Sequence, residues 1–154
     1  MGNRQFLIVC RVGDRSLHSE WTSGPHRNFD LFLSYFGDDT EKYRGDAEFY
    51  EAVKGPKWPI IHRIVTENDE LFRKYDAVWF PDDDLSASTA TINRMFNLFA
   101  GLGFDLAQPA LTPDSYVFYR ELIARPDWLA RHFNFVEVMA PIFSQNCLQQ
   151  LKHT

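Results

Sequence analysis

The chain has 154 residues, of which 45% are apolar and 24% charged, an ordinary composition for a globular protein. Its formal net charge of −5 argues against a nucleic-acid-binding surface, because phosphate backbones are bound by basic faces. The longest apolar run near the start, Phe6 to Cys10, is too short for a membrane span or a signal-peptide core. We therefore expect a cytoplasmic protein with no membrane segment and a single domain over residues 1–154.

The two cysteines, Cys10 and Cys147, lie far apart and have no metal-binding or redox spacing. Cys10 falls in a predicted buried strand and Cys147 on a predicted helix. Both are expected to be small packing residues in a reducing compartment rather than partners in a disulfide.

Strands are predicted from short runs of Phe, Leu, Ile and Val, and helices from apolar residues three or four positions apart. Pro59 suits the first turn of a helix, Ser86 or Ser88 can cap the next one, and Gly101 ends it. In chain order the sequence predicts strand 5–12, strand 28–36, helix 46–53, helix 58–75, strand 77–80 extended back to Tyr75, helix 88–100, strand 104–108, strand 133–143 interrupted at Pro141, and helix 144–151.

Alternating strands and helices predict an α/β fold with a mainly parallel central sheet and helices on both faces. In such sheets, ligands bind beyond the carboxyl ends of the strands. Residues that follow predicted strands are therefore the first candidates for a functional site.

The strongest candidate is the run Asp82-Asp83-Asp84, which follows the apolar segment Val78–Phe80 and Pro81. Three carboxylates this close repel one another unless something neutralises them. Carboxylate oxygens suit Mg²⁺ or Mn²⁺, which can bridge to substrate phosphates, and the spacing lets Asp82 and Asp84 converge while Asp83 points elsewhere. The alternative is a solvated acidic turn before the next helix.

Four more residues outside this run are candidates for ligand contact. Lys54 and Lys57 flank a Gly-Pro turn before a helix and could meet a diphosphate, or they could form a solvated basic loop. Gln108 ends a predicted strand on the same sheet edge, where it could reach an acceptor. Glu137 is flanked by apolar residues, so it either faces a cleft as a catalytic base or points to solvent.

The ordered segments NFDLFLSYFGD, KGPKWPIIHRIV, KYDAVWFPDDDLSASTATINRMF, DLAQPAL and NFVEVMAPIFS resemble the family catalogued as domain of unknown function 707. That family is similar to glycosyltransferases with the GT-A fold. The resemblance covers residues 28–151, and its PDDD and FVEVMAP segments are the distinctive ones.

The resemblance implies a GT-A-like half that binds a nucleoside-diphosphate sugar and uses Mn²⁺ or Mg²⁺. Asp82 and Asp84 would form its DxD motif, with Asp82 towards the ribose or a metal-bound water and Asp84 on the metal. Asp83 would be among the residues that bind the nucleotide sugar. Arg11 would lie near the base or the phosphates, or it is a surface charge. The family pattern continues past FVEVMAP with a Trp-Gly-Leu-Asp-like stretch and a late histidine, so we expect this chain to lack the acceptor part.

Two rival functions stay open. One is a nucleotide-sugar and metal-binding module that has lost turnover. The other is a phosphotransferase of the haloacid-dehalogenase type, since Asp82-Asp83-Asp84-Leu85-Ser86 loosely fits its motif with Asp82 as nucleophile. That motif normally follows a first strand, whereas here some eighty residues precede it.

Overall fold

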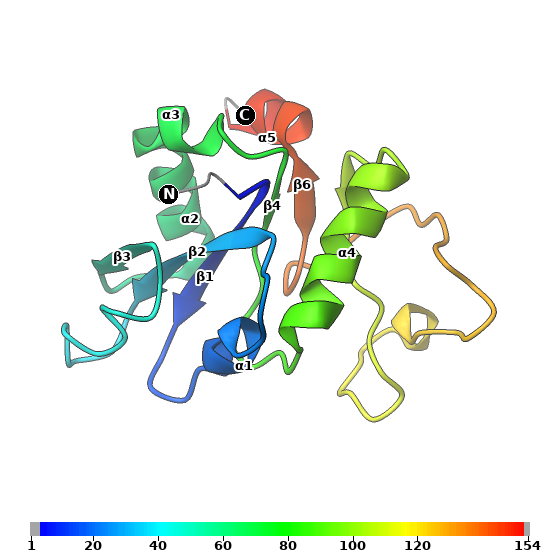
Figure 1. Ribbon diagram of the computed structural model, residues 1–154, viewed down its shortest axis with the longest axis horizontal. Helices are drawn as coiled ribbons and strands as arrows, with labels where there is room; N and C mark the ends of the chain where they lie inside the picture. The colour runs from blue at the N-terminus through cyan, green and yellow to red at the C-terminus, as the bar shows by residue number, and fades with distance from the viewer. Residues whose placement is uncertain (1–3, 153–154) are drawn as a thin grey trace.

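The computed structural model describes residues 4–152 as an α/β fold around one six-stranded sheet (Figure 1). The strand order is β3-β2-β1-β4-β6-β5. Strands β1 to β4 run parallel, and β6 is antiparallel to both of its neighbours. The strands are β1 (Phe6–Val12), β2 (Phe29–Tyr35), β3 (Phe49–Ala52), β4 (Ala77–Trp79), β5 (Leu106–Ala107) and β6 (Ile142–Ser144).

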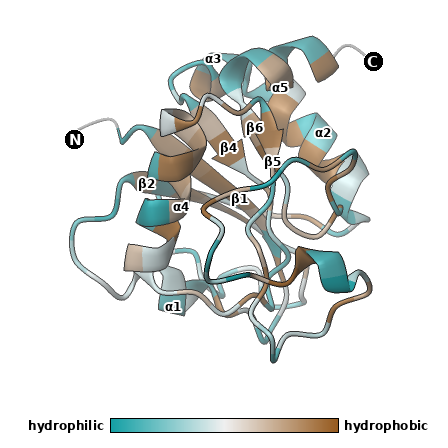
Figure 2. Ribbon diagram, turned by 90° about the vertical axis from the view of Figure 1, so that its right-hand side faces the viewer, coloured by the Kyte–Doolittle hydropathy of each residue, from teal (hydrophilic) through white to brown (hydrophobic). Residues whose placement is uncertain are grey.

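Helices cover both faces of the sheet, because side chains of β1 and β2 alternate between two hydrophobic cores. One core joins the sheet to helices α1 and α4, and the other joins it to α2, α3 and α5. Figure 2 shows the central strands in the brown of hydrophobic residues. The helices are α1 (His18–Thr22), α2 (Lys57–Glu67), α3 (Asp69–Phe72), α4 (Thr89–Gly101) and α5 (Gln145–Leu151), with a short 3-10 helix η1 (Arg120–Leu122).

The central strands and the capped helices confirm the sequence predictions. All seven residues of β1 and all seven of β2 are buried, as continuous apolar runs indicate. Ser88 accepts a hydrogen bond from the Thr91 N–H and so caps α4, while Ser144 accepts one from Cys147 and caps α5. Both cysteines are free, and Cys10 is buried. No helix within residues 4–152 is long and apolar enough to cross a membrane.

The predicted helix at 46–53 is wrong, since Phe49–Ala52 is strand β3 and pairs with Phe32–Tyr35 of β2. Four residues carry too little periodicity to distinguish a strand from a helix, and the free edge of β2 decides the outcome. The predicted helix 58–75 is divided into α2 and α3 at Asn68, whose side-chain amide donates to the Ile64 carbonyl.

The predicted strands at 104–108 and 133–143 are mostly wrong. Within these two segments only β5 (Leu106–Ala107) and the start of β6 (Ile142–Ser144) are strands; β6 pairs with β4 on one side and with β5 on the other. Most of the connection between β5 and β6 is irregular. It passes through η1 and extends to the right of α4 in Figure 1. Apolar composition in this segment therefore does not reflect sheet pairing.

The phenol of Tyr75, which is buried in the core, supplies a test of the packing. Its O–H donates to Asp30 Oδ2 at 2.8 Å, and Asp30 also pairs with Arg4. Burial and the Asp30 carboxylate raise the pKa of Tyr75 above its ordinary value. We expect Tyr75→Phe to lower the free energy of unfolding by about 1–3 kcal/mol, because a buried carboxylate loses a donor.

Urea unfolding measures this change. Tyr116→Phe is the matched control, because Tyr116 is 92% exposed. Equal midpoints for Tyr75→Phe and the parent chain would contradict the assigned role of the bond.

Candidate functional site

The candidate site lies where the strand order reverses. The chain proceeds from β1 to β2 and β3 on one side, and then returns to place β4 on the other side of β1. In open α/β sheets, the crevice beyond the carboxyl ends of two such strands is the usual ligand site. Gly13 follows β1 there, and the predicted aspartate run follows β4.

Asp83 joins the residues that follow β1 to those that follow β4. Its Oδ2 accepts a hydrogen bond from the Gly13 N–H at 2.7 Å, and its backbone carbonyl accepts one from Leu17 at 2.7 Å. A Cβ on residue 13 would meet the Phe36 ring at 2.8 Å, so only glycine permits this approach without moving the ring. Asp83 therefore orders the turn after β1.

Asp82 forms an ion pair with Lys57 at the start of α2. The distance from Lys57 Nζ to Asp82 Oδ1 is 2.6 Å, and Nζ also donates to the Val138 carbonyl at 3.0 Å. The Asp82 N–H in turn donates to the Met139 carbonyl at 2.7 Å. One lysine thus holds the first aspartate against the segment that leads into β6.

Asp84 is exposed, and within residues 4–152 its carboxylate makes no hydrogen bond or ion pair. The three aspartates consequently have three different environments: one is paired with a lysine, one is bonded to a backbone amide, and one is free. Within the described part of the chain, no three His, Cys, Asp or Glu side chains gather in a group that could hold a metal ion.

Arg11 is not a surface charge, since it is only 5% exposed. It donates to Ser34 Oγ, to the Val53 carbonyl and to the Gly55 carbonyl, each at 2.8 Å. Burial lowers the pKa of its guanidinium, and the charge of Glu51 partly offsets that change. Arg11 therefore fixes the turn between β3 and α2, from which Lys57 extends.

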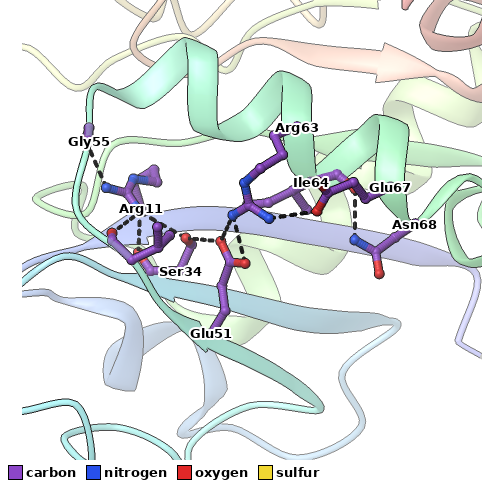
Figure 3. Close-up of polar contacts among 9 residues, drawn as sticks. Arg11, Ser34, Glu51, Gly55, Arg63, Ile64, Glu67 and Asn68 are labelled. Carbon is purple, nitrogen blue, oxygen red and sulfur yellow. Dashed lines mark hydrogen bonds and ion pairs between the residues drawn. The ribbon is translucent and has the colours of Figure 1, made fainter.

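Glu51 extends this hydrogen-bond network from Ser34 to helix α2. It accepts from Ser34 Oγ at 2.6 Å and from Arg63 at 2.7 Å, and Arg63 also pairs with Glu67 (Figure 3). The basic turn is thus attached to β1, to β2 and to the helix that follows it.

Lys54, the other predicted lysine, pairs with Asp38 across exposed surface. Surface pairs of this kind contribute little to stability. The two lysines therefore separate, with Lys57 at the aspartate run and Lys54 on an exposed ion pair.

Gln108 and Glu137 lie together, as the Glu137 N–H donates to Gln108 Oε1 at 2.6 Å. Both side chains are half-buried. The next two residues, Val138 and Met139, carry the carbonyls that contact Lys57 and Asp82. A short segment therefore connects the predicted acceptor residues to the aspartate run.

A buried histidine near the end of β1 was not predicted. His18 is 1% exposed, with Nδ1 at 2.8 Å from Ser16 Oγ and Nε2 at 3.2 Å from Asp46 Oδ2. Asp46 lies 28 residues further along the chain, so no local spacing indicates this contact. The only sequence signal was the position of Ser16 and His18 directly after a buried strand.

No protein-family model matches the chain, and no curated protein shows significant sequence similarity to it. Its function is therefore inferred from the geometry of the site.

The hydrogen bonds of Arg11 lead to a prediction about stability. Arg11→Lys retains a positive charge but loses the planar donor set that reaches three separate acceptors. We expect the free energy of unfolding to fall by about 1–3 kcal/mol, because partly buried carbonyls lose their donor.

Denaturant unfolding of Arg11→Lys beside Arg15→Lys measures the effect. Arg15 is exposed and makes no hydrogen bond or ion pair within the described residues, so its substitution should leave the midpoint unchanged. A shift of the same size in both variants would show that the network adds nothing specific.

Proposed function

We propose that this chain is the nucleotide-sugar-binding domain of a metal-dependent glycosyltransferase with a GT-A-like fold, related to the family of domain of unknown function 707. It would bind a nucleoside-diphosphate sugar whose sugar is transferred to an acceptor. The observation that carries the proposal is the aspartate run at the reversal of strand order, where one carboxylate is free and another is balanced by a lysine.

Each of the three aspartates has its own role in this proposal. Asp84, which is exposed, ligates the cation together with Asp82. A divalent cation held there supplies positive charge for the departing nucleoside diphosphate. Asp83 keeps Gly13 in place, so the turn after β1 can approach the nucleotide closely.

Lys57 has two successive partners in this proposal. In the ligand-free chain it neutralises Asp82. A bound diphosphate would offer Lys57 a phosphate oxygen in place of Asp82, and the start of α2 would add backbone N–H groups. Lys54 contributes to the same basic turn from its exposed position.

Base and acceptor contacts are assigned to the flanks of the crevice. Phe36 is 42% exposed beside Gly13, and its ring offers an apolar face to a nucleobase, with Arg11 behind it at 5.4 Å. Gln108 orients the backbone at Glu137, whose own carboxylate is the candidate catalytic base towards the acceptor. Free Cys10 and Cys147 agree with a cytoplasmic location for this domain.

A binding module that has lost turnover is the second candidate. The described site offers two carboxylates for a cation, and Glu137 is the only acceptor-side acid assigned to the crevice within residues 4–152. Such a module would bind the nucleotide sugar and leave it intact. A haloacid-dehalogenase-type phosphotransferase would use Asp82 as its nucleophile, but its motif normally follows a first strand, whereas this run follows β4.

Calorimetric titration with UDP and with GDP, in the presence and absence of Mn²⁺, tests the proposal. We expect binding of at least one nucleotide that requires the cation. Asp84→Asn should weaken it by at least roughly tenfold, or ~1.4 kcal/mol, because a charged ligand is lost. Asp127→Asn is the matched control, as Asp127 is exposed on the β5–β6 connection.

The result that would overturn the proposal is an absence of cation-dependent binding by the parent chain. Sugar release or transfer from a bound donor distinguishes the enzyme from the inert module. Hydrolysis of a generic phosphate ester with Mg²⁺ would favour the phosphotransferase instead.

The ion pair between Lys57 and Asp82 predicts two opposite effects of one substitution. Lys57→Gln removes the competitor for Asp82, so affinity for Mn²⁺ alone should rise, by up to roughly fivefold if the pair is worth about 1 kcal/mol. The same substitution should weaken binding of the Mn²⁺–nucleotide complex, because a phosphate partner is lost.

Titrations of Mn²⁺ alone and of Mn²⁺ with nucleotide measure both changes. Lys54→Gln is the control and should leave the affinity for Mn²⁺ alone unchanged, because Lys54 pairs with Asp38. Changes of the same sign in both titrations of Lys57→Gln would contradict the assigned exchange of partners.

A further inference from the structure

A cavity of about 390 Å³ lies between α4 and the β5–β6 connection, apart from the aspartate run. Small-molecule sites commonly have volumes of about 300–1,000 Å³ and mainly apolar walls. Met95, Leu98 and Phe99 of α4 form one wall of this cavity. Leu122, Trp128 and Phe133 of the connection form the other.

The connection leaves several large apolar side chains exposed around this cavity. Trp128 is 52% exposed, Leu129 61% and Phe133 42%. An isolated exposed apolar residue needs no explanation, but a group that lines one cavity marks a binding site. The apolar wall is therefore available to a ligand.

The charged side chains of the lining all have the same sign. Arg94, Arg125 and Arg131 line the cavity, and among its described lining residues there is no Asp or Glu. This is unusual in a chain with a net charge of −5. The cavity is thus a locally cationic site on an acidic protein, which attracts anions.

The arginines are available to a ligand, because within residues 4–152 none of the three forms an ion pair with a carboxylate. Arg131 is held by aromatic rings instead, with its guanidinium 4.6 Å from the ring of Phe133 and 5.6 Å from that of Trp128. Arg125 lies 5.4 Å from the Trp128 ring. Stacking on a ring orients a guanidinium and leaves its N–H groups free to donate to an anion.

We propose that this cavity binds a single amphiphilic anion, a long-chain carboxylate whose apolar chain lies along α4 and whose carboxylate meets the arginines. The apolar walls select the chain, and the guanidiniums select the charge of the head group. The cavity is open to solvent on one side, and its volume of about 390 Å³ between two walls fits one ligand molecule rather than a membrane surface. The aspartate run, Lys54 and Lys57 do not line this cavity. Gln108 does, so the cavity adjoins the acceptor side of the proposed site and is distinct from its nucleotide side.

Titration calorimetry with dodecanoate, below its micelle concentration, tests the proposal on the whole chain. Dodecyltrimethylammonium, with the same chain and the opposite charge, should bind at least roughly tenfold more weakly. Butanoate, with the same head group and little chain, should also bind at least roughly tenfold more weakly. Quenching of tryptophan fluorescence that disappears in Trp128→Phe places the ligand in this cavity.

Substitutions distinguish the contribution of the arginine charges from that of the apolar space. Arg94→Gln combined with Arg131→Gln should weaken dodecanoate by at least roughly tenfold and leave dodecyltrimethylammonium unchanged or tighter. Arg44→Gln, outside the lining, is the control and should change neither. Ala124→Trp fills the cavity and should weaken both probes, and circular dichroism checks that it remains folded.

Equal affinity for the two head groups would overturn the proposal, since the site would then be an unselective apolar surface. Lack of dodecanoate binding, or binding only to anionic vesicles, would overturn it as well. Binding of UDP with Mn²⁺ should be the same in every variant of the cavity, so failure here is distinguishable from failure of the proposed glycosyltransferase function.

Discussion

The buried guanidinium of Arg11 positions the residues on one side of the candidate site. Arg11 is removed from water at the end of β1, and a buried cation is tolerated only when its donors are satisfied. Its acceptors come from β2 and from the turn after β3, so three parallel strands and the start of α2 are held in one arrangement. The position of Lys57 depends on that arrangement, because it is the first residue of the helix.

The other side of the candidate site, where the turn after β1 meets the residues that follow β4, depends on the Asp83 carboxylate. Its bond to the Gly13 amide and the bond from Leu17 to its carbonyl attach the turn after β1 to the residues that follow β4. The edge of the sheet beyond β1 and β4 is therefore held by backbone hydrogen bonds and buried polar contacts. The Lys57–Asp82 ion pair and the free Asp84 are more exposed than these contacts.

The central part of the fold was predictable because its signals are local. Continuous apolar runs indicate β1 and β2, and Ser88 marks the start of α4 with a cap that the structure contains. Strand β3 was not predictable, since pairing with β2 decides its state. Phe133 and Phe135 look like strand residues but line a cavity in an irregular connection, where ring contacts with each other and with Tyr119 replace sheet pairing.

In the candidate site, too, local features were predictable from the sequence and long-range contacts were not. The position of the aspartate run after an apolar strand was readable from the sequence, and so was the basic turn before α2. Their partners were not, since Lys57 and Asp82 are 25 residues apart and Gly13 and Asp83 are 70 apart. Burial of Arg11 also escaped prediction, because its acceptors are two backbone carbonyls and a serine that no sequence pattern marks.

The two outermost strands are short, with four residues in β3 and two in β5. An edge strand exposes unpaired backbone donors and acceptors, and a long one offers a template on which a second chain can add a strand. Edges this short present few such groups in a row. The sheet therefore gives other chains little opportunity for strand-by-strand aggregation, although its central strands have the apolar composition that favours it.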